Sequence, residues 1–287
     1  MKKNLVKKAV LPVFVALLCS VIALTSVSYA WFSLGNQASV TGMDMEVTAA
    51  DGLQVSTTGN ANDFKSTLTL SESKANVKAV STDGNYASGL NFFTGQIVEG
   101  VLGGVTPAAT TDYIMFDIYV KVSSVTTLQL DSTSVVAAVA NTKGKTLQTN
   151  LAARVAFVDL GSATTPDGAK ALDTTTETAV EGTAVIWEPN STKRSDAAKN
   201  AGNLTDGQKV GYKGIVDATG KETTSNMTTF DFIEENAGKS VKLVDLEAGY
   251  NKVRVYIWLE GQDVDCVNEV SGGKFSITLH LSKPNAQ

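Results

Sequence analysis

The residues best suited to chemistry lie in an acidic segment near the carboxyl end of the chain. Residues 260–269 (EGQDVDCVNE) hold four carboxylates, with Asn268 as a further oxygen ligand. Calcium prefers clustered carboxylate and carbonyl oxygens, so Glu260, Asp263 and Asp265 are predicted to form a weak calcium site. The spacing matches no EF-hand loop, and the alternative is an acidic turn whose charges are simply solvated.

Other catalytic chemistry finds little support in the sequence. His280 is the single histidine, which excludes a His-Glu-x-x-His zinc site. A Ser-His-Asp triad would have to use His280, and no Gly-x-Ser-x-Gly precedes it. Cys266 is expected to be a small, buried or half-buried side chain. We therefore expect no enzymatic activity and no cofactor beyond the possible calcium.

The amino-terminal segment has the three parts of a secretory signal peptide. Four lysines precede an apolar run that extends from Ala9 to Leu24. Ser28 and Ala30 are small residues at the two positions that a signal peptidase recognises. We predict a signal peptide over 1–30, cleaved between Ala30 and Trp31. The alternative is an uncleaved anchor, although the apolar run is short for a spanning helix. The protein is therefore expected to be secreted, touching membrane only through this segment.

Charge and cysteine content limit the partners further. Cleavage removes four lysines and no acidic residue, which takes the net charge from −5 to −9. Nucleic acids and anionic membranes require a cationic surface, so neither is expected as a partner. Cys266 is the only cysteine after residue 30, which excludes an intramolecular disulfide in the processed chain.

Alternation of apolar and polar residues predicts many β-strands in the remaining chain. Turn formers such as Asp51-Gly52 and Gly272-Gly273 separate them, a pattern typical of an all-β sandwich. Two short helices are expected, over 195–201 and 229–237, and 161–235 is interpreted as an irregular insertion in a single 31–287 domain. The expected strands lie at 43–47, 68–70, 113–122, 128–130, 155–160, 184–187, 253–259 and 275–281.

Three stretches resemble exported Gram-positive proteins. The junction Ser-Tyr-Ala-Trp-Phe-Ser at 28–33, followed by the strand from Met43, resembles the start of the TasA and camelysin proteins, which a dedicated signal peptidase, SipW, processes. Stretches at 154–156 with 186–190, and at 256–266, resemble a related group of clostridial surface proteins. The resemblance implies a jelly-roll β-sandwich that assembles into extracellular matrix fibres. The metalloprotease label of camelysin does not carry over, because the histidines are missing.

Two functions therefore remain open at this point. The first is a secreted, self-associating structural protein of the cell surface or biofilm matrix, whose partner is itself or another surface protein. The second is an adhesin or glycan-binding module. Trp187 and Trp258 could form its sugar platform, and the alternative is that they belong to the core, where a β-sandwich usually places its tryptophans. For the first, the assembly strand is predicted at the new amino terminus, where the residues Trp31, Phe32, Leu34 and Val40 belong to an uncharged segment without proline. The alternative is that 31–42 folds back as the first strand of its own domain.

Overall fold

The computed structural model describes the greater part of the chain after residue 42. The residues described are 43–49, 52–72, 77–86, 90–98, 101–173, 184–202, 205–206, 232–233, 240–261, 263 and 265–284. The predicted signal peptide, its cleavage site between Ala30 and Trp31, and the predicted assembly residues lie outside them. Within the described residues no helix is long and apolar enough to cross a membrane.

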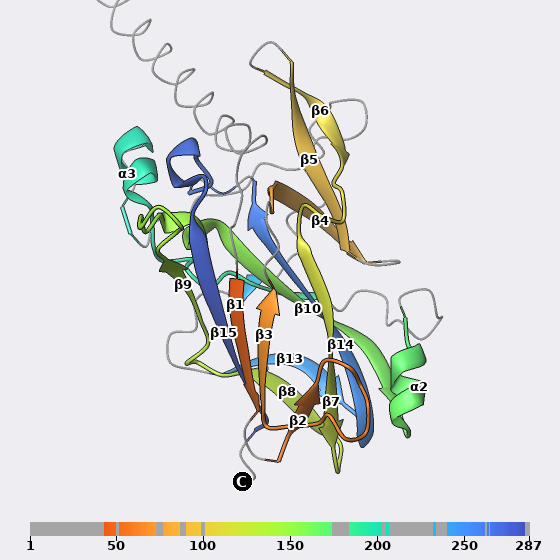
Figure 1. Cartoon of the computed structure of the whole chain (residues 1–287). Helices are drawn as coiled ribbons and strands as arrows, with labels where there is room; N and C mark the ends of the chain where they lie inside the picture. The colour runs from red at the N-terminus through yellow and green to blue at the C-terminus, as the bar shows by residue number, and fades with distance from the viewer. Residues whose placement is uncertain are drawn as a thin grey trace, which may run out of the picture.

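One face of the molecule is a mixed sheet in which the first and last long strands lie side by side (Figure 1). Within the described residues it has six strands in the order β13-β8-β15-β1-β3, with β9 also paired to β15. β1 runs parallel to β15 and antiparallel to β3. The bounds are β1 (Met43–Ala49), β3 (Thr67–Glu72), β8 (Thr126–Leu130), β9 (Val135–Val139), β13 (Val241–Leu246) and β15 (Lys274–Ser282).

The second sheet is larger and is centred on the two longest strands. Its described strands follow the order β12-β11-β10-β14-β4-β5-β6, and β7 pairs with both β14 and β2. The bounds are β2 (Gln54–Ser56), β4 (Ala79–Tyr86), β5 (Leu90–Val98), β6 (Val101–Pro107), β7 (Ile114–Val122), β10 (Ala153–Ala163), β11 (Ala184–Trp187), β12 (Phe232–Ile233) and β14 (Gly249–Glu260). All eight predicted strand regions therefore form strands.

The main hydrophobic core lies between these sheets. Alternate residues of β15, such as Phe275 and Ile277, pack in one buried cluster with Val155 and Phe157 of β10 and with Val255 of β14. Burying side chains of this size stabilises the fold by about 1.5–3 kcal/mol each. The chain is thus an all-β sandwich, as the alternation predicts. The jelly-roll connectivity implied by the resemblance stays a prediction.

A second apolar layer covers the outer face of the larger sheet. Phe92 of β5 stacks on Tyr113 with ring centroids 4.2 Å apart and meets the edge of Trp258 at 5.2 Å. Tyr256 and Trp258 of β14 belong to this outer cluster, whereas Val255 and Ile257 face the main core. Because β14 is buried on both faces, its sequence from 253 onward is largely apolar rather than strictly alternating.

The short helices differ in part from the prediction. α3 (Asp196–Gly202) matches the helix expected over 195–201. The helix expected over 229–237 is wrong where the structure describes it, because Phe232 and Ile233 form β12, paired in parallel with β11. Extension in a sheet satisfies the backbone of these residues, and tertiary context overrides their helical propensity. An additional helix, α2 (Pro166–Ala171), begins where the Thr165 hydroxyl accepts a hydrogen bond from the Gly168 amide.

Candidate functional site

The predicted acidic site lies where β14 ends, and its three carboxylates are buried. Glu260 is the last residue of β14, and Asp263 and Asp265 follow in the turn that it begins. Backbone hydrogen bonds from Asp263 to Glu260 and from Cys266 to Asp263 tighten this turn. The alternative of a solvated acidic turn is therefore wrong, because the turn is folded against the end of the sheet.

Arg154 of β10 is the central cation of this site. It lies opposite Trp258 in the β10–β14 ladder, and its side chain is fully buried. Its Nη2 forms ion pairs with Asp263 and with Glu188, the latter at 2.8 Å, and its Nη1 donates to the Ala153 carbonyl oxygen at 3.0 Å. A buried guanidinium requires such carboxylate and carbonyl partners to offset its lost hydration.

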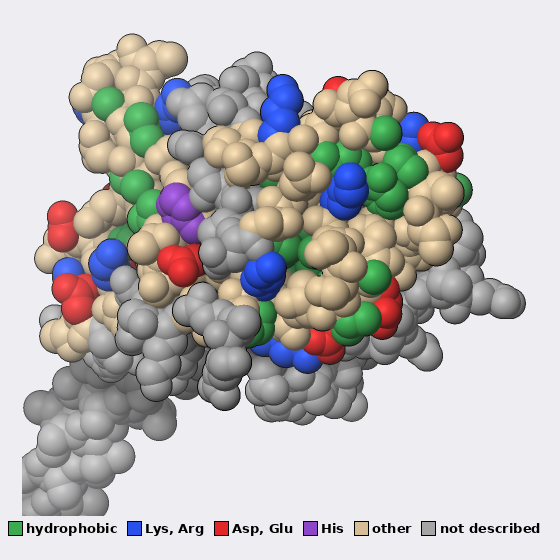
Figure 2. All heavy atoms as spheres, turned by 90° about the horizontal axis from the view of Figure 1, so that it is seen from below, with side chains coloured by type: hydrophobic (Ala, Val, Ile, Leu, Met, Phe, Trp, Pro, Cys, Tyr) green, Lys and Arg blue, Asp and Glu red, His purple; other side chains and the backbone are tan. Residues whose placement is uncertain are grey.

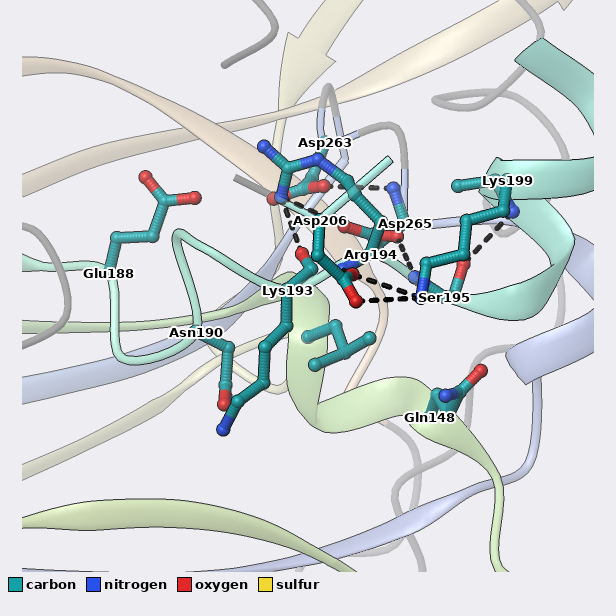
Figure 3. Close-up of polar contacts among 12 residues, drawn as sticks. Gln148, Glu188, Asn190, Lys193, Arg194, Ser195, Lys199, Asp206, Asp263 and Asp265 are labelled. Atoms are coloured by element: carbon teal, nitrogen blue, oxygen red, sulfur yellow. Dashed lines mark hydrogen bonds and ion pairs between the residues drawn. The ribbon is translucent and has the colours of Figure 1, made fainter. Parts of the chain in front are cut away.

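Arg194 supplies the second cation and attaches the segment before α3. Asp265 accepts a hydrogen bond from the Ser195 amide at 2.6 Å and pairs with Arg194 Nη1 at 3.4 Å. Ser195 in turn caps α3, since its hydroxyl accepts from the Ala198 amide at 3.1 Å. Figure 3 shows Asp265 lying between Arg194 and Ser195, with Asp263 close by. The turn after β14 therefore holds the start of α3 in place.

Burial has a marked effect on the acid–base properties of this cluster. It raises the pKa of Asp265 to about 6, and the neighbouring negative charge of Asp263 contributes to the same shift. Burial also raises the pKa of the Cys266 thiol well above its usual value, with Asp263 and Glu260 adding to the effect. Cys266 is fully buried, as expected, and a protonated thiol in such surroundings is a poor nucleophile.

Glu260 is engaged separately from the two aspartates. Its Oε2 accepts from the indole Nε1 of Trp258 at 3.1 Å, and its Oε1 accepts from the hydroxyl of Ser81 on β4. This carboxylate thus joins β14 to β4, where the two strands begin to pair in parallel.

The arrangement gives the predicted calcium site no support. Glu260, Asp263 and Asp265 all bind donors from the protein, and two guanidinium groups stand where a cation would be needed. Among the described residues, no group of three or more His, Cys, Asp and Glu side chains is placed to hold a metal ion. The sequence reasoning missed Arg154 and Arg194. An arginine inside the apolar run RVAFV was the available signal, because a buried guanidinium needs a carboxylate partner.

The other residues singled out from the sequence are dispersed. Trp187 and Trp258 are 1% and 0% exposed and belong to the two opposite apolar clusters, so they are core residues, as the alternative predicts, and form no sugar platform. His280 is half-buried on β15, where its amide donates to the Ser134 hydroxyl. In Figure 2 its ring reaches the surface, on a face where acidic and basic side chains are interspersed.

No protein-family model matches this chain, and neither a curated protein nor a solved structure matches it significantly. The resemblance to the TasA and camelysin proteins therefore rests on the quoted motifs alone and stays a prediction.

Proposed function

We propose that the protein is a secreted, self-associating structural protein of the cell surface or extracellular matrix. The observation that carries this proposal is the contrast between the two edges of the six-stranded sheet. A sheet edge presents unpaired backbone donors and acceptors, and proteins that stay monomeric blunt it with charges, prolines or bulges. β13 and β3 are the last strands at the two ends of this sheet among the described residues.

The β13 edge carries the protective features. Lys242 and Asp245 are exposed on it, and the pairing with β8 shifts register between Lys242 and Val244. The β3 edge has fewer of them. Its single charged residue, Glu72, is the last of the strand, residues 67–71 (TLTLS) carry no charge and no proline, and β3 pairs with β1 over six residues without a shift in register. A strand of this kind is a suitable template for a strand from another copy.

The segment that fits this template precedes β1. Residues 31–42 are uncharged, contain no proline and begin with Trp31 and Phe32. Twelve extended residues span roughly 40 Å, which is enough to cross the strand of a neighbouring molecule. Release of this segment by signal peptidase would confine assembly to the outside of the cell. The glycan-binding alternative has lost its named platform, since both tryptophans are buried.

The test compares two proteins that differ only in this segment. A form starting at Trp31 is expected to give filaments in negative-stain electron microscopy, whereas a folded form starting at Thr41 is expected to stay unassembled and to bind an added 31–42 peptide. Equal filament formation by the two forms would contradict the donor-strand proposal.

The acceptor strand is tested with a matched pair of substitutions in the form starting at Trp31. Thr69→Lys places a charge on the β3 edge and is expected to prevent filaments. Thr142→Lys adds the same charge at an exposed turn position and is expected to leave them unchanged. Filaments that persist in Thr69→Lys would exclude β3 as the acceptor.

A further inference from the structure

The start of α3 is an ordered segment whose own hydrogen bonds join residues that are close in the chain. This α3 segment comprises residues 194–202. The Ser195 hydroxyl accepts from the Ala198 amide at 3.1 Å, and the Asp206 carboxylate accepts from the Arg194 amide at 2.9 Å. These bonds shape the segment without attaching it to either sheet, so other contacts must hold it against the sandwich.

Asp265 attaches the α3 segment to the turn after β14. Its Oδ1 accepts from the Ser195 amide at 2.6 Å, its Oδ2 pairs with Arg194 Nη1 at 3.4 Å, and its side chain is 0% exposed. Figure 3 shows this carboxylate lying between the two residues. A further hydrogen bond, from the Asp196 amide to Gln148 Oε1 at 2.9 Å, lies at the surface, where water competes with it. Asp265 therefore makes a buried attachment of this segment.

The surroundings of Asp265 disfavour its negative charge. The 3.4 Å contact with Arg194 is longer than the roughly 2.7–2.9 Å of a close charged hydrogen bond. Asp263 accepts from the Asp265 amide at 2.8 Å and brings a second negative charge, whose own cation is Arg154. Burial and this charge outweigh the contacts with Ser195 and Arg194, and they raise the pKa of Asp265 to about 6, against about 4 in water.

The other charged groups near the turn do not replace Asp265 in this role. They are bonded as pairs or to donors: Glu188 with Arg154, Glu260 with Trp258, and Lys199 with Asp206. Burial keeps the Cys266 thiol protonated, and the hydrogen bond from Lys199 lowers the pKa of Asp206. Substitution of Asp265 leaves all of these groups in place and so isolates its titration.

We propose that Asp265 is a pH-dependent attachment for the α3 segment, which stays docked while this carboxyl group is protonated and is released from the turn in a growing fraction of molecules as the group loses its proton. Release exposes the carboxylate to water, where its pKa is ordinary, so docking is strongest in acid and weakens until about pH 7. Between pH 5 and 7.5 the ratio of released to docked molecules is expected to rise about tenfold. The attachment uses neither residues 31–42 nor β3, so it does not depend on the proposed function.

Hydrogen exchange followed by mass spectrometry tests this attachment in the form starting at Trp31. After correction for the intrinsic effect of pH on exchange, the protection of 194–202 is expected to fall about tenfold between pH 5 and 7.5. It should stay below the protection of β14, which lies at the centre of the larger sheet. Asp265→Asn keeps an oxygen for the Ser195 amide and is expected to abolish the pH dependence of protection in 194–202.

Asp206→Asn is the matched control. It makes the same change at a carboxylate that is 59% exposed and bonded to the same segment. This variant is expected to retain the tenfold change with pH, whatever its effect on the absolute protection. Protection of 194–202 that is independent of pH, or that changes equally in Asp265→Asn, would overturn the proposal. Equal protection of 194–202 and β14 would mean that the segment opens only on global unfolding, which would also overturn it.

Discussion

Two ionic clusters, one around Arg154 and one around Arg254, lie on the same pair of strands and on the same face of the larger sheet, yet they differ in their exposure to water. Arg154 lies opposite Trp258 in the β10–β14 ladder, and Arg254 lies opposite Val158 four residues away. The Arg154 side chain is 0% exposed, whereas that of Arg254 is 13% exposed. Arg254 pairs with Asp117 through Nε at 2.7 Å and with Asp173 at 3.4 Å.

The difference between them is access to water. Around Arg254 the carboxylates of Asp117 and Asp173 keep part of their hydration, and Asp117 raises the pKa of Arg254 chiefly through its hydrogen bonds. Around Arg154 the guanidinium is fully buried and the Asp263 side chain is only 4% exposed, so these two groups depend on each other, whereas Glu188 is 13% exposed. An arginine–carboxylate ion pair is therefore expected to be essential for stability at Arg154 and to contribute only modestly to stability at Arg254.

The largest expected effect follows from removing the buried cation. Arg154→Met keeps much of the side-chain volume but leaves Asp263 and Glu188 without their guanidinium, and it is expected to lower the free energy of unfolding by about 3–5 kcal/mol. Chemical denaturation followed by tryptophan fluorescence measures the loss, since Trp187 and Trp258 are buried.

Arg254→Met is the matched control for this experiment. Its expected loss is at most about 2 kcal/mol, because Asp117 can recover hydration. Adding Asp263→Asn to Arg154→Met removes one stranded charge and is expected to restore part of the stability. Equal losses for Arg154→Met and Arg254→Met would remove the distinction between the clusters.

The next effect concerns the pH dependence of stability. Asp265 has a folded-state pKa of about 6, above its value in an unfolded chain, so between about pH 4 and 6 the folded state binds more protons. The free energy of unfolding then falls as pH rises through this window. Asp265→Asn retains an oxygen for the Ser195 amide and removes the charge. Relative to the unsubstituted protein, this variant is expected to gain on the order of 2–3 kcal/mol between pH 4 and 6.5.

Other carboxyl groups change the free energy of unfolding outside the range of pH 4 to 6.5, or they change it equally in the unsubstituted protein and in Asp265→Asn. Hydrogen bonds lower the pKa of Asp131 and Asp245, so their contribution is lost only as pH falls below about 4. Burial raises the pKa of Asp159, and this effect cancels when the two proteins are compared. Denaturation curves at a series of pH values give the difference, and parallel stability profiles would show that Asp265 does not titrate in the folded protein.

The sequence predicts the strands well where alternation is strong and poorly where it is not. β15 alternates strictly, and its predicted face is the buried one. β4 (AVSTDGNY) and β6 (VLGGVTP) contain turn-forming Asp, Gly and Asn or paired glycines, and they form strands only because β14 and β5 supply partners. Propensity in strands depends on such neighbours, which a local pattern cannot supply.

The prediction of the ionic site from the sequence is limited in the same way. The acidic residues were visible in the sequence as a cluster, which favoured calcium or a solvated turn. Their cations come from far along the chain: Arg154 lies 109 residues before Asp263, and Arg194 lies 71 residues before Asp265. Only the pairing of β10 with β14 and the placement of the segment before α3 bring these charges together.

The smallest effect on stability is expected for the most exposed of the ion pairs compared, that of Lys242 with Asp245. Lys242 and Asp245 of β13 pair at 2.7 Å, but their side chains are 61% and 67% exposed, so water replaces either partner at little cost. Lys242→Ala is expected to change the free energy of unfolding by less than about 0.5 kcal/mol. The hydrogen bond from Lys242 is the main reason for the lowered pKa of Asp245. The variant should therefore raise that pKa towards its ordinary value, as measured by NMR titration of the carboxyl carbon. A shifted pKa with unchanged stability would show that this ion pair contributes less to the free energy of unfolding than the ion pairs of Arg254. A loss of stability as large as that of Arg254→Met would mean that exposure does not set the strength of these ion pairs.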